Sequence, residues 1–219
     1  MKLDEILQEL APHHATLVAV SKTHPVPMIQ DLYDQGQRDF GENKVQELVD
    51  KQGQLPQDIR WHFIGHLQTN KVKYLTPFVH LIHAVDSIKV LKEIDKRAGH
   101  DGRCIDCLLQ FHIAEEDTKF GLDLTEAREL LQSEAYRSME NIRIAGVMGM
   151  ATYTEDEAQV RREFGHLKAI FDALKAECFP DAMYFKEISM GMSSDYPLAL
   201  EEGSTMVRIG SLLFGEREY

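Results

Sequence analysis

The chain has 219 residues, 43% of them hydrophobic and 27% charged, which is the ordinary balance of a globular protein and fits one domain. Its formal net charge of −12 argues against a general nucleic-acid or membrane-surface binder, although local amides and a few cations would still hold a small anion. Three cysteines do not make a disulfide framework, no apolar run is long enough to span a membrane, and the N-terminus MKLDEILQEL is no signal peptide, so we expect a cytoplasmic protein.

Eight short apolar runs alternate with longer amphipathic stretches. Most runs are apolar on both faces, which is typical of parallel strands covered by helices. Eight βα units of roughly 27 residues each predict an α/β protein with a single (β/α)₈ TIM barrel over residues 1–219. An open doubly wound sheet is the alternative that the pattern leaves open. The predicted strands are Thr16–Lys22, Arg38–Asn43, Trp61–His66, Leu81–Ser87, Cys104–Ile113, Ile142–Met150, Phe185–Met192 and Met206–Gly215.

The segments between the strands carry helical periodicity and helix-start signals. We expect capping boxes at Asp123 with Glu126 and at Thr154 with Glu157, and a short helix over Pro197–Glu202. The helix after Thr154 should bury one apolar stripe. The stripe consists of Val160, Phe164, Leu167, Phe171 and Leu174.

Polar or glycine-rich residues follow the carboxyl ends of most predicted strands. In a barrel these ends share one face, which carries the active site. Lys22 ends the first strand directly after a run of buried-type residues. A charged lysine is costly to bury there, and a neutral amine is what condensation with a carbonyl group needs. The alternative is a lysine that leaves the strand for solvent.

Two segments independently predict a phosphate site. Ser193, Ser194 and Asp195 precede the short predicted helix, and hydroxyls with free amides at a helix start suit an anion. Ordinary capping by Ser194 or Asp195 would also explain them. Gly210 and Ser211 follow the last predicted strand, and the loops after strands seven and eight commonly bind phosphate in barrels.

Arg208 lies two residues before Gly210, so both share one face of the last strand. The arginine would point inward at an acceptor atom of a ligand. An ion pair with Glu187 inside the barrel is the alternative.

Two further motifs have weaker functional interpretations. Cys104 and Cys107 spell C-x-x-C, but three residues apart on a strand they face opposite sides, so we expect no redox pair. His62 and His66 lie four residues apart without the glutamate of an H-E-x-x-H site, so we expect no metal.

Several separate blocks of the sequence resemble one known family. The segments AVSKTHP, FGENKVQE, WHFIGHLQTNK, SMGMSSD and GSTMVRIGSLLFGERE are similar to motifs of the YggS/PROSC family of pyridoxal phosphate homeostasis proteins. The similarity runs from about Leu17 to Tyr219. It implies a barrel like the N-terminal domain of alanine racemase, a role in vitamin B6 homeostasis and pyridoxal 5′-phosphate (PLP) held as a Schiff base, an aldimine on Lys22.

The same resemblance implies roles for further residues. Asn43 would lie near the cofactor ring, and Arg208 near its pyridine nitrogen. This chain has His24 where many members of the family have a second lysine in the motif SKTKP, which bears on any role of that lysine in cofactor exchange. The phosphate would lie among Ser189, Ser193, Gly210 and Ser211.

Two functions fit such a cofactor. One is a monomeric carrier that buffers PLP and hands it to apo PLP-enzymes, and the other is an amino-acid racemase or decarboxylase. Racemisation needs acid/base groups on both faces of the substrate carbon. The chain is expected to lack the second domain of alanine racemase. An arginine at the pyridine nitrogen would weaken the ability of the cofactor ring to withdraw electrons from a substrate. Every tyrosine except Tyr196 is expected away from the strand-end loops. We therefore expect a carrier and no enzyme.

Overall fold

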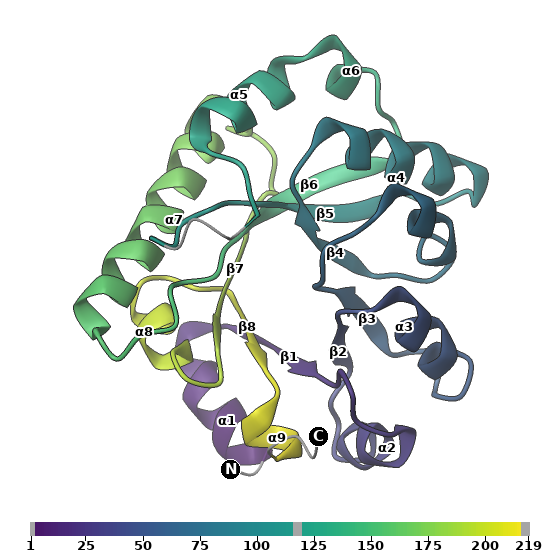
Figure 1. The fold of residues 1–219 in the computed structure, drawn as a ribbon, viewed down its shortest axis with the longest axis vertical. Helices are drawn as coiled ribbons and strands as arrows, with labels where there is room; N and C mark the ends of the chain where they lie inside the picture. Colours follow the sequence, from purple (N-terminus) through teal and green to yellow (C-terminus); the bar gives the residue numbers. More distant parts are fainter. Residues whose placement is uncertain (1–2, 116–119, 216–219) are drawn as a thin grey trace.

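The computed structural model describes residues 3–115 and 120–215, and in it eight parallel strands form one closed barrel. The strands follow one another around the ring in chain order, and β1 pairs with β8 to close it (Figure 1). This confirms the predicted (β/α)₈ barrel and all eight strands. They are β1 (Thr16–Val20), β2 (Asp39–Glu42), β3 (Arg60–Phe63), β4 (Leu81–Val85), β5 (Ile105–Gln110), β6 (Ile142–Met148), β7 (Glu187–Met192) and β8 (Met206–Ile209).

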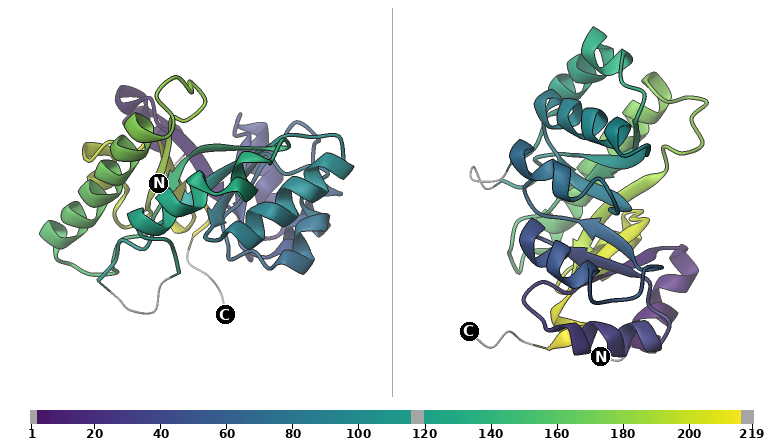
Figure 2. Two further views of the ribbon diagram at one scale, coloured as in Figure 1. Left: turned by 90° about the horizontal axis from the view of Figure 1, so that it is seen from above. Right: turned by 90° about the vertical axis from the view of Figure 1, so that its right-hand side faces the viewer.

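Helices cover the outside of the barrel, and Figure 2 shows them flanking the strands on both sides. On α7, four of the five predicted stripe residues are buried, whereas Phe171 is partly exposed. The helices are α1 (Leu3–Leu10), α2 (Val26–Asp34), α3 (Val45–Gln52), α4 (Ile88–His100), α5 (Leu124–Gln132), α6 (Glu134–Arg137), α7 (Glu157–Glu177), α8 (Tyr196–Glu201) and α9 (Ser211–Phe214), with 3₁₀ turns η1 (Ala11–His13) and η2 (Thr69–Tyr74).

One of the two predicted capping boxes is present. The Glu126 amide donates to Asp123 Oδ1 at 2.8 Å, and the Asp123 amide donates to Glu126 Oε2 at 2.9 Å. The box predicted at Thr154 is wrong, because Asp156 caps α7 and accepts from the Gln159 amide. Thr154 instead accepts a hydrogen bond from the Asp156 amide, so it shapes the turn before the helix.

Two predicted boundaries shift at the C-terminal end of the chain. The last strand ends at Ile209, and the apolar run Ser211–Phe214, expected as strand, forms α9. The backbone approaches β1 closely at Gly210, where a Cβ would lie 3.2 Å from the Val20 carbonyl oxygen, a tight contact. The helix expected over 197–202 begins and ends one residue earlier, as α8.

The apolar core has two parts. The larger part packs the strands against the helices, and a smaller cluster comes from five strands, β1, β4, β5, β6 and β8, with Met150 packed against it. No helix in the described ranges is both long and apolar enough to cross a membrane. The smaller cluster contains Val18, Leu81, Ala84, Leu108, Ala145, Met148 and Met206.

Candidate functional site

A cavity of about 480 Å³ lies at the carboxyl ends of the strands, a volume typical of small-molecule sites. The residues that line it come from β1, β7, β8 and α9, or from the loops that follow β1, β2, β3, β6, β7, β8 and α9. This is the face on which barrels carry their sites. Six of the seven predicted site residues line the cavity: Lys22, Asn43, Ser193, Arg208, Gly210 and Ser211.

The backbone directly after Lys22 adopts an uncommon conformation. Thr23 has a φ of 69°, in the left-handed region that a β-branched residue rarely enters. Its amide donates to Glu47 Oε1 at 2.5 Å, and its hydroxyl donates to the Lys22 carbonyl oxygen at 2.5 Å. Such strained residues persist only where their surroundings hold them, and they cluster at functional sites.

A buried ion cluster holds the strand end just before Lys22. The Lys51 ammonium donates to Glu42 Oε1, to Glu47 Oε1 and to the Ser21 carbonyl oxygen, each at 2.7 Å. The Ser21 hydroxyl donates to Glu42 Oε1 at 2.6 Å. Burial raises the pKa of Glu42, although hydrogen bonds from Lys51 and Ser21 oppose that rise. The sequence pattern did not single out this cluster, because its members lie on β2, α3 and the loop after β1.

Asn43 follows β2 and offers an unmatched polar atom. Its Oδ1 is buried and has no hydrogen-bond partner among the described residues, although the side chain lines the cavity. A buried polar atom without a partner costs about 1–3 kcal/mol. A ligand with polar ring substituents would supply the missing partner.

The loops after β7 and β8 meet at the cavity, as predicted. The Gly210 amide donates to Ser193 Oγ at 3.2 Å, which joins the two loops. Asp195 Oδ1 accepts from the Met192 amide at 2.6 Å, so this carboxylate closes the loop before α8. The hydroxyls of Ser193 and Ser211 therefore share one end of the cavity with the Gly210 backbone.

Arg208 reaches the cavity from inside the barrel. It is buried, its Nη1 donates to Ser189 Oγ at 2.6 Å, and its Nη2 donates to the Gly149 carbonyl oxygen at 3.1 Å. Burial lowers the pKa of Arg208 to about 10, which leaves the guanidinium charged at neutral pH. The alternative ion pair with Glu187 does not form, since that carboxylate accepts from the Thr205 hydroxyl and lies near the Lys186 ammonium.

Ser189 lies outside the cavity, although it was expected beside the phosphate. It is fully buried and does not line the cavity, because it lies in the middle of β7, in register with Met206 of β8. Its hydroxyl contacts Arg208 and His83, one layer below the expected phosphate site.

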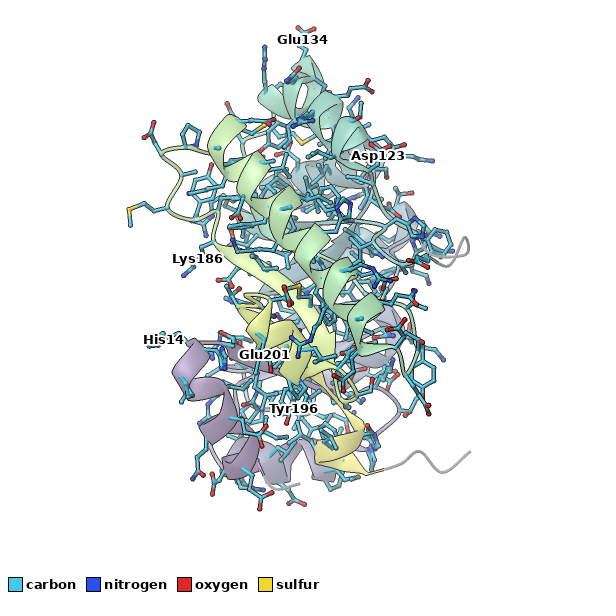
Figure 3. All side chains as sticks on the ribbon, turned by 90° about the vertical axis from the view of Figure 1, so that its left-hand side faces the viewer. His14, Asp123, Glu134, Lys186, Tyr196 and Glu201 are labelled. Carbon is cyan, nitrogen blue, oxygen red and sulfur yellow. The ribbon has the colours of Figure 1, made fainter. Side chains whose placement is uncertain are left out.

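Aromatic residues border the cavity. His24 stacks on Phe214 of α9, with ring centroids 4.8 Å apart, and Tyr153 lines the cavity with 87% of its surface exposed. The expectation that tyrosines other than Tyr196 lie away from the strand-end loops is therefore wrong for Tyr153. Tyr196 is buried, and its hydroxyl donates to Glu9 Oε2 at 2.5 Å, between α8 and α1 (Figure 3).

The weaker motifs do not contribute to this cavity. Cys107 is buried in β5 and burial raises the pKa of its thiol, whereas Cys104 is exposed, and neither forms a disulfide. β3 ends at Phe63, so His62 lies in the strand and His66 lies in the following loop.

A closed (β/α)₈ barrel with a lysine after its first strand and hydroxyl groups after its last two strands defines the class of alanine-racemase-like barrels. The family described as Alanine racemase, N-terminal domain, matches residues 4–218. The pyridoxal phosphate homeostasis protein of Aquifex aeolicus is 41% identical over 94% of this chain and 88% of its own. The chain belongs to the family of pyridoxal phosphate homeostasis proteins, which confirms the resemblance seen in its motifs.

Solved structures agree with this assignment. PipY of Synechococcus elongatus PCC7942, without PLP, is 36% identical and matches with a TM-score of 0.89, over 97% of this chain and 98% of PipY. The structure of PipY with PLP bound matches with a TM-score of 0.87 and the same identity and coverage.

Proposed function

We propose that this chain binds PLP in the cavity at the carboxyl ends of its strands and carries or buffers it in vitamin B6 homeostasis. Lys22 would hold the cofactor covalently, and Arg208 would donate to the pyridine nitrogen. Ser193, Gly210 and Ser211 would hold the phosphate. The observation that carries the proposal is that one cavity brings together Lys22, a buried arginine and a hydroxyl-lined loop pair.

The residues present fit the chemistry of this group. The cavity combines a primary amine, a cation, two serine hydroxyls and a glycine backbone that permits close approach. The buried Asn43 Oδ1, which has no hydrogen-bond partner among the described residues, supports the proposal, because a hydrogen-bond donor on the ring would supply that partner. The relative PipY, 36% identical, has a structure described as having PLP bound.

The residues around the expected position of the pyridine nitrogen favour a carrier of PLP over an enzyme. When bound, PLP supplies a reactive aldehyde and a ring that withdraws electrons. The protein groups around the ring determine whether this electron withdrawal leads to a reaction. Arg208 is a charged donor, so it favours an unprotonated ring nitrogen and weak electron withdrawal. Tyr196 is engaged with Glu9 and does not line the cavity. A racemase or decarboxylase is the second candidate, and Tyr153 is the residue at the cavity rim that would favour it.

The wider setting is part of the same proposal. Residues 1–219 would form one domain and act as a monomer, without nucleic-acid or membrane partners. PLP would pass to apo PLP-enzymes in the cytoplasm. The net charge of −12 and three unpaired cysteines, which suit a reducing compartment, support this setting.

A transfer experiment tests the carrier function. The PLP-loaded protein is passed through a desalting column and mixed with an apo-aminotransferase, in the presence of a phosphatase that destroys free PLP. The loaded wild-type protein and the matched control Lys44→Ala, which changes an exposed lysine beside Asn43, should reactivate the enzyme. Lys22→Ala should not. Loss of PLP on the column, or no reactivation by the loaded wild type, would refute the carrier function.

A further inference from the structure

A chain of hydrogen bonds crosses the interior of the barrel below the cavity. Arg208 Nη1 lies 2.6 Å from Ser189 Oγ, and that oxygen lies 2.9 Å from His83 Nδ1. His83 Nε2 lies 2.9 Å from His62 Nδ1, and His62 Nε2 lies 3.0 Å from Asp39 Oδ1. The five residues come from five strands, and all are buried. The chain thus links the cavity to the opposite end of the barrel.

The chemistry of its two ends sets the hydrogen-bond direction at each end of this chain, and the histidine tautomers set it between them. An arginine only donates and a carboxylate only accepts. Burial lowers the pKa of His83 well below its usual range, so this ring is neutral and carries one proton. In the tautomer in which His62 donates from Nε2 to Asp39 and carries no proton on Nδ1, that Nδ1 accepts from His83 Nε2.

The directions of the two remaining hydrogen bonds follow from these tautomers. His83 Nδ1 must accept the Ser189 hydroxyl proton, and Ser189 Oγ accepts from Arg208. In every hydrogen bond of the chain, the donor is therefore the residue nearer to the Arg208 end. Aligned hydrogen bonds of this kind polarise one another, and together they stabilise a cation at one end and an anion at the other.

The far end of the chain is held as an anion by Arg60. This guanidinium donates to both oxygens of Asp39, at 2.7 and 2.5 Å. Burial would raise the pKa of Asp39, but hydrogen bonds from Arg60 and His62 outweigh it and hold the pKa at about 2.

The same corner of the barrel has the spacing of a metal site. Ligand atoms of Asp39, His62 and His80 lie within 4.8 Å of one another. Arg60 already occupies both carboxylate oxygens, so a cation would compete with a guanidinium for each of them. Asp39 is therefore better described as the counter-charge of the hydrogen-bonded chain than as a metal ligand.

We propose that Asp39, His62, His83 and Ser189 are positioning residues for Arg208, which hold its guanidinium in one orientation toward the cavity. The inference rests on the proposed function, because the group that Arg208 would face is the pyridine nitrogen of PLP. It adds that the barrel interior, and not only the strand-end loops, sets the electronic state of the cofactor. Arg208 donates to Ser189 and Gly149 below the cavity that it lines, so its remaining N–H groups have a fixed direction.

The apo-protein gives the first readout. In protein labelled with ¹⁵N-histidine, spectra that correlate ring nitrogens with ring protons should show the proton of His83 on Nε2 and that of His62 on Nε2. A His83 ring that carries its proton on Nδ1 would contradict the chain. This measurement needs no cofactor, so it stays decisive even if the wild type fails to bind PLP, which would refute the proposed function separately.

The loaded protein gives the second readout. Ser189→Ala should release PLP about tenfold faster, equivalent to about 1.4 kcal/mol, and should shift the ¹⁵N resonance of the ring nitrogen of labelled PLP. Ser189→Thr keeps the hydroxyl and should restore both values. Ser204→Ala is the matched control, because this buried hydroxyl contacts only the carbonyl oxygens of β7 and β8, at 2.8–3.2 Å. Equal release rates and equal resonances in Ser189→Ala and Ser204→Ala would overturn the proposal.

Discussion

The Thr23 amide donates to Glu47 Oε1, 2.5 Å away, and thereby fixes the residue after Lys22 in a left-handed conformation. The same carboxylate oxygen accepts from the Lys51 ammonium, which also reaches the Ser21 carbonyl oxygen. Both neighbours of Lys22 are therefore tied to one buried cation. This arrangement fixes the backbone on both sides of Lys22 before any ligand arrives, which is the preorganisation that covalent attachment at Lys22 would need.

The first prediction concerns this buried cation. Lys51→Met should lower the free energy of unfolding by about 3–5 kcal/mol, because it leaves the carboxylate of Glu42 buried without its counter-charge. The matched control Lys168→Met breaks an exposed pair with Asp172 and should cost about 0–1 kcal/mol. Urea unfolding of the apo-proteins measures both. The double variant Lys51→Met/Glu42→Gln should recover part of the loss, and similar losses for Lys51→Met and Lys168→Met would contradict the role of the cluster.

The second prediction concerns acid. The pKa of Asp39 is about 2 in the folded chain against 3.8 as a model value, so its contribution to stability is present above pH 3.8 and is lost as the pH falls toward 2. The shift corresponds to about 2 kcal/mol. The difference in unfolding free energy between wild type and Asp39→Asn should therefore shrink from about pH 5 to about pH 2. A difference that stays constant over this range would show that Arg60 and His62 do not stabilise the ionised carboxylate.

The third prediction concerns the phosphate. Pyridoxal without phosphate should bind at least about tenfold more weakly than PLP, equivalent to about 1.4 kcal/mol, because the serines and the Gly210 backbone at one end of the cavity then have no anion to hold. Ser211→Ala should weaken PLP and leave pyridoxal unchanged, so pyridoxal serves as the control ligand. Fluorescence or absorbance titration gives both constants. Equal affinity for the two ligands, or equal loss in Ser211→Ala, would argue against a phosphate site here.

The fourth prediction concerns activity. With PLP and alanine present, solvent deuterium exchange at the α-carbon should not exceed the rate of free PLP, because Arg208 favours a neutral pyridine nitrogen. Tyr153 lines the cavity and is the tyrosine to examine as an acid/base group. Tyr153→Phe should therefore have no effect on exchange. Saturable, stereospecific exchange that Tyr153→Phe and Lys22→Ala both abolish would establish the enzyme instead of the carrier.

The sequence predicted the barrel and most cavity residues for a clear physical reason. Strand-end residues of a parallel barrel meet on one face whatever the details of the loops. Lys22, Arg208 and Gly210 could therefore be placed from strand position alone. The end of the last strand was misplaced because the run Leu212–Phe214 is apolar in either conformation, and the burial of Phe214 depends on tertiary packing.

The interior chain could not be predicted in the same way. His83 meets Ser189 across 106 positions of sequence, and its contact with His62 depends on the stagger of neighbouring strands. Ser189 was expected at the phosphate only from the resemblance to the family, and the register of β7 places it a layer deeper. Tyr153 was missed because its place depends on the path of the loop before α7.

Covalent attachment to Lys22 is the central claim, and peptide mapping after borohydride reduction tests it most directly. The PLP-loaded protein is reduced and digested, and the pyridoxyl-labelled peptide is identified by mass spectrometry. The label should lie on Lys22 in the wild type and in Lys44→Ala, and Lys22→Ala should fold normally yet carry no label and show no aldehyde–amine absorbance band. A label found only on another lysine, such as Lys71, would contradict the assignment.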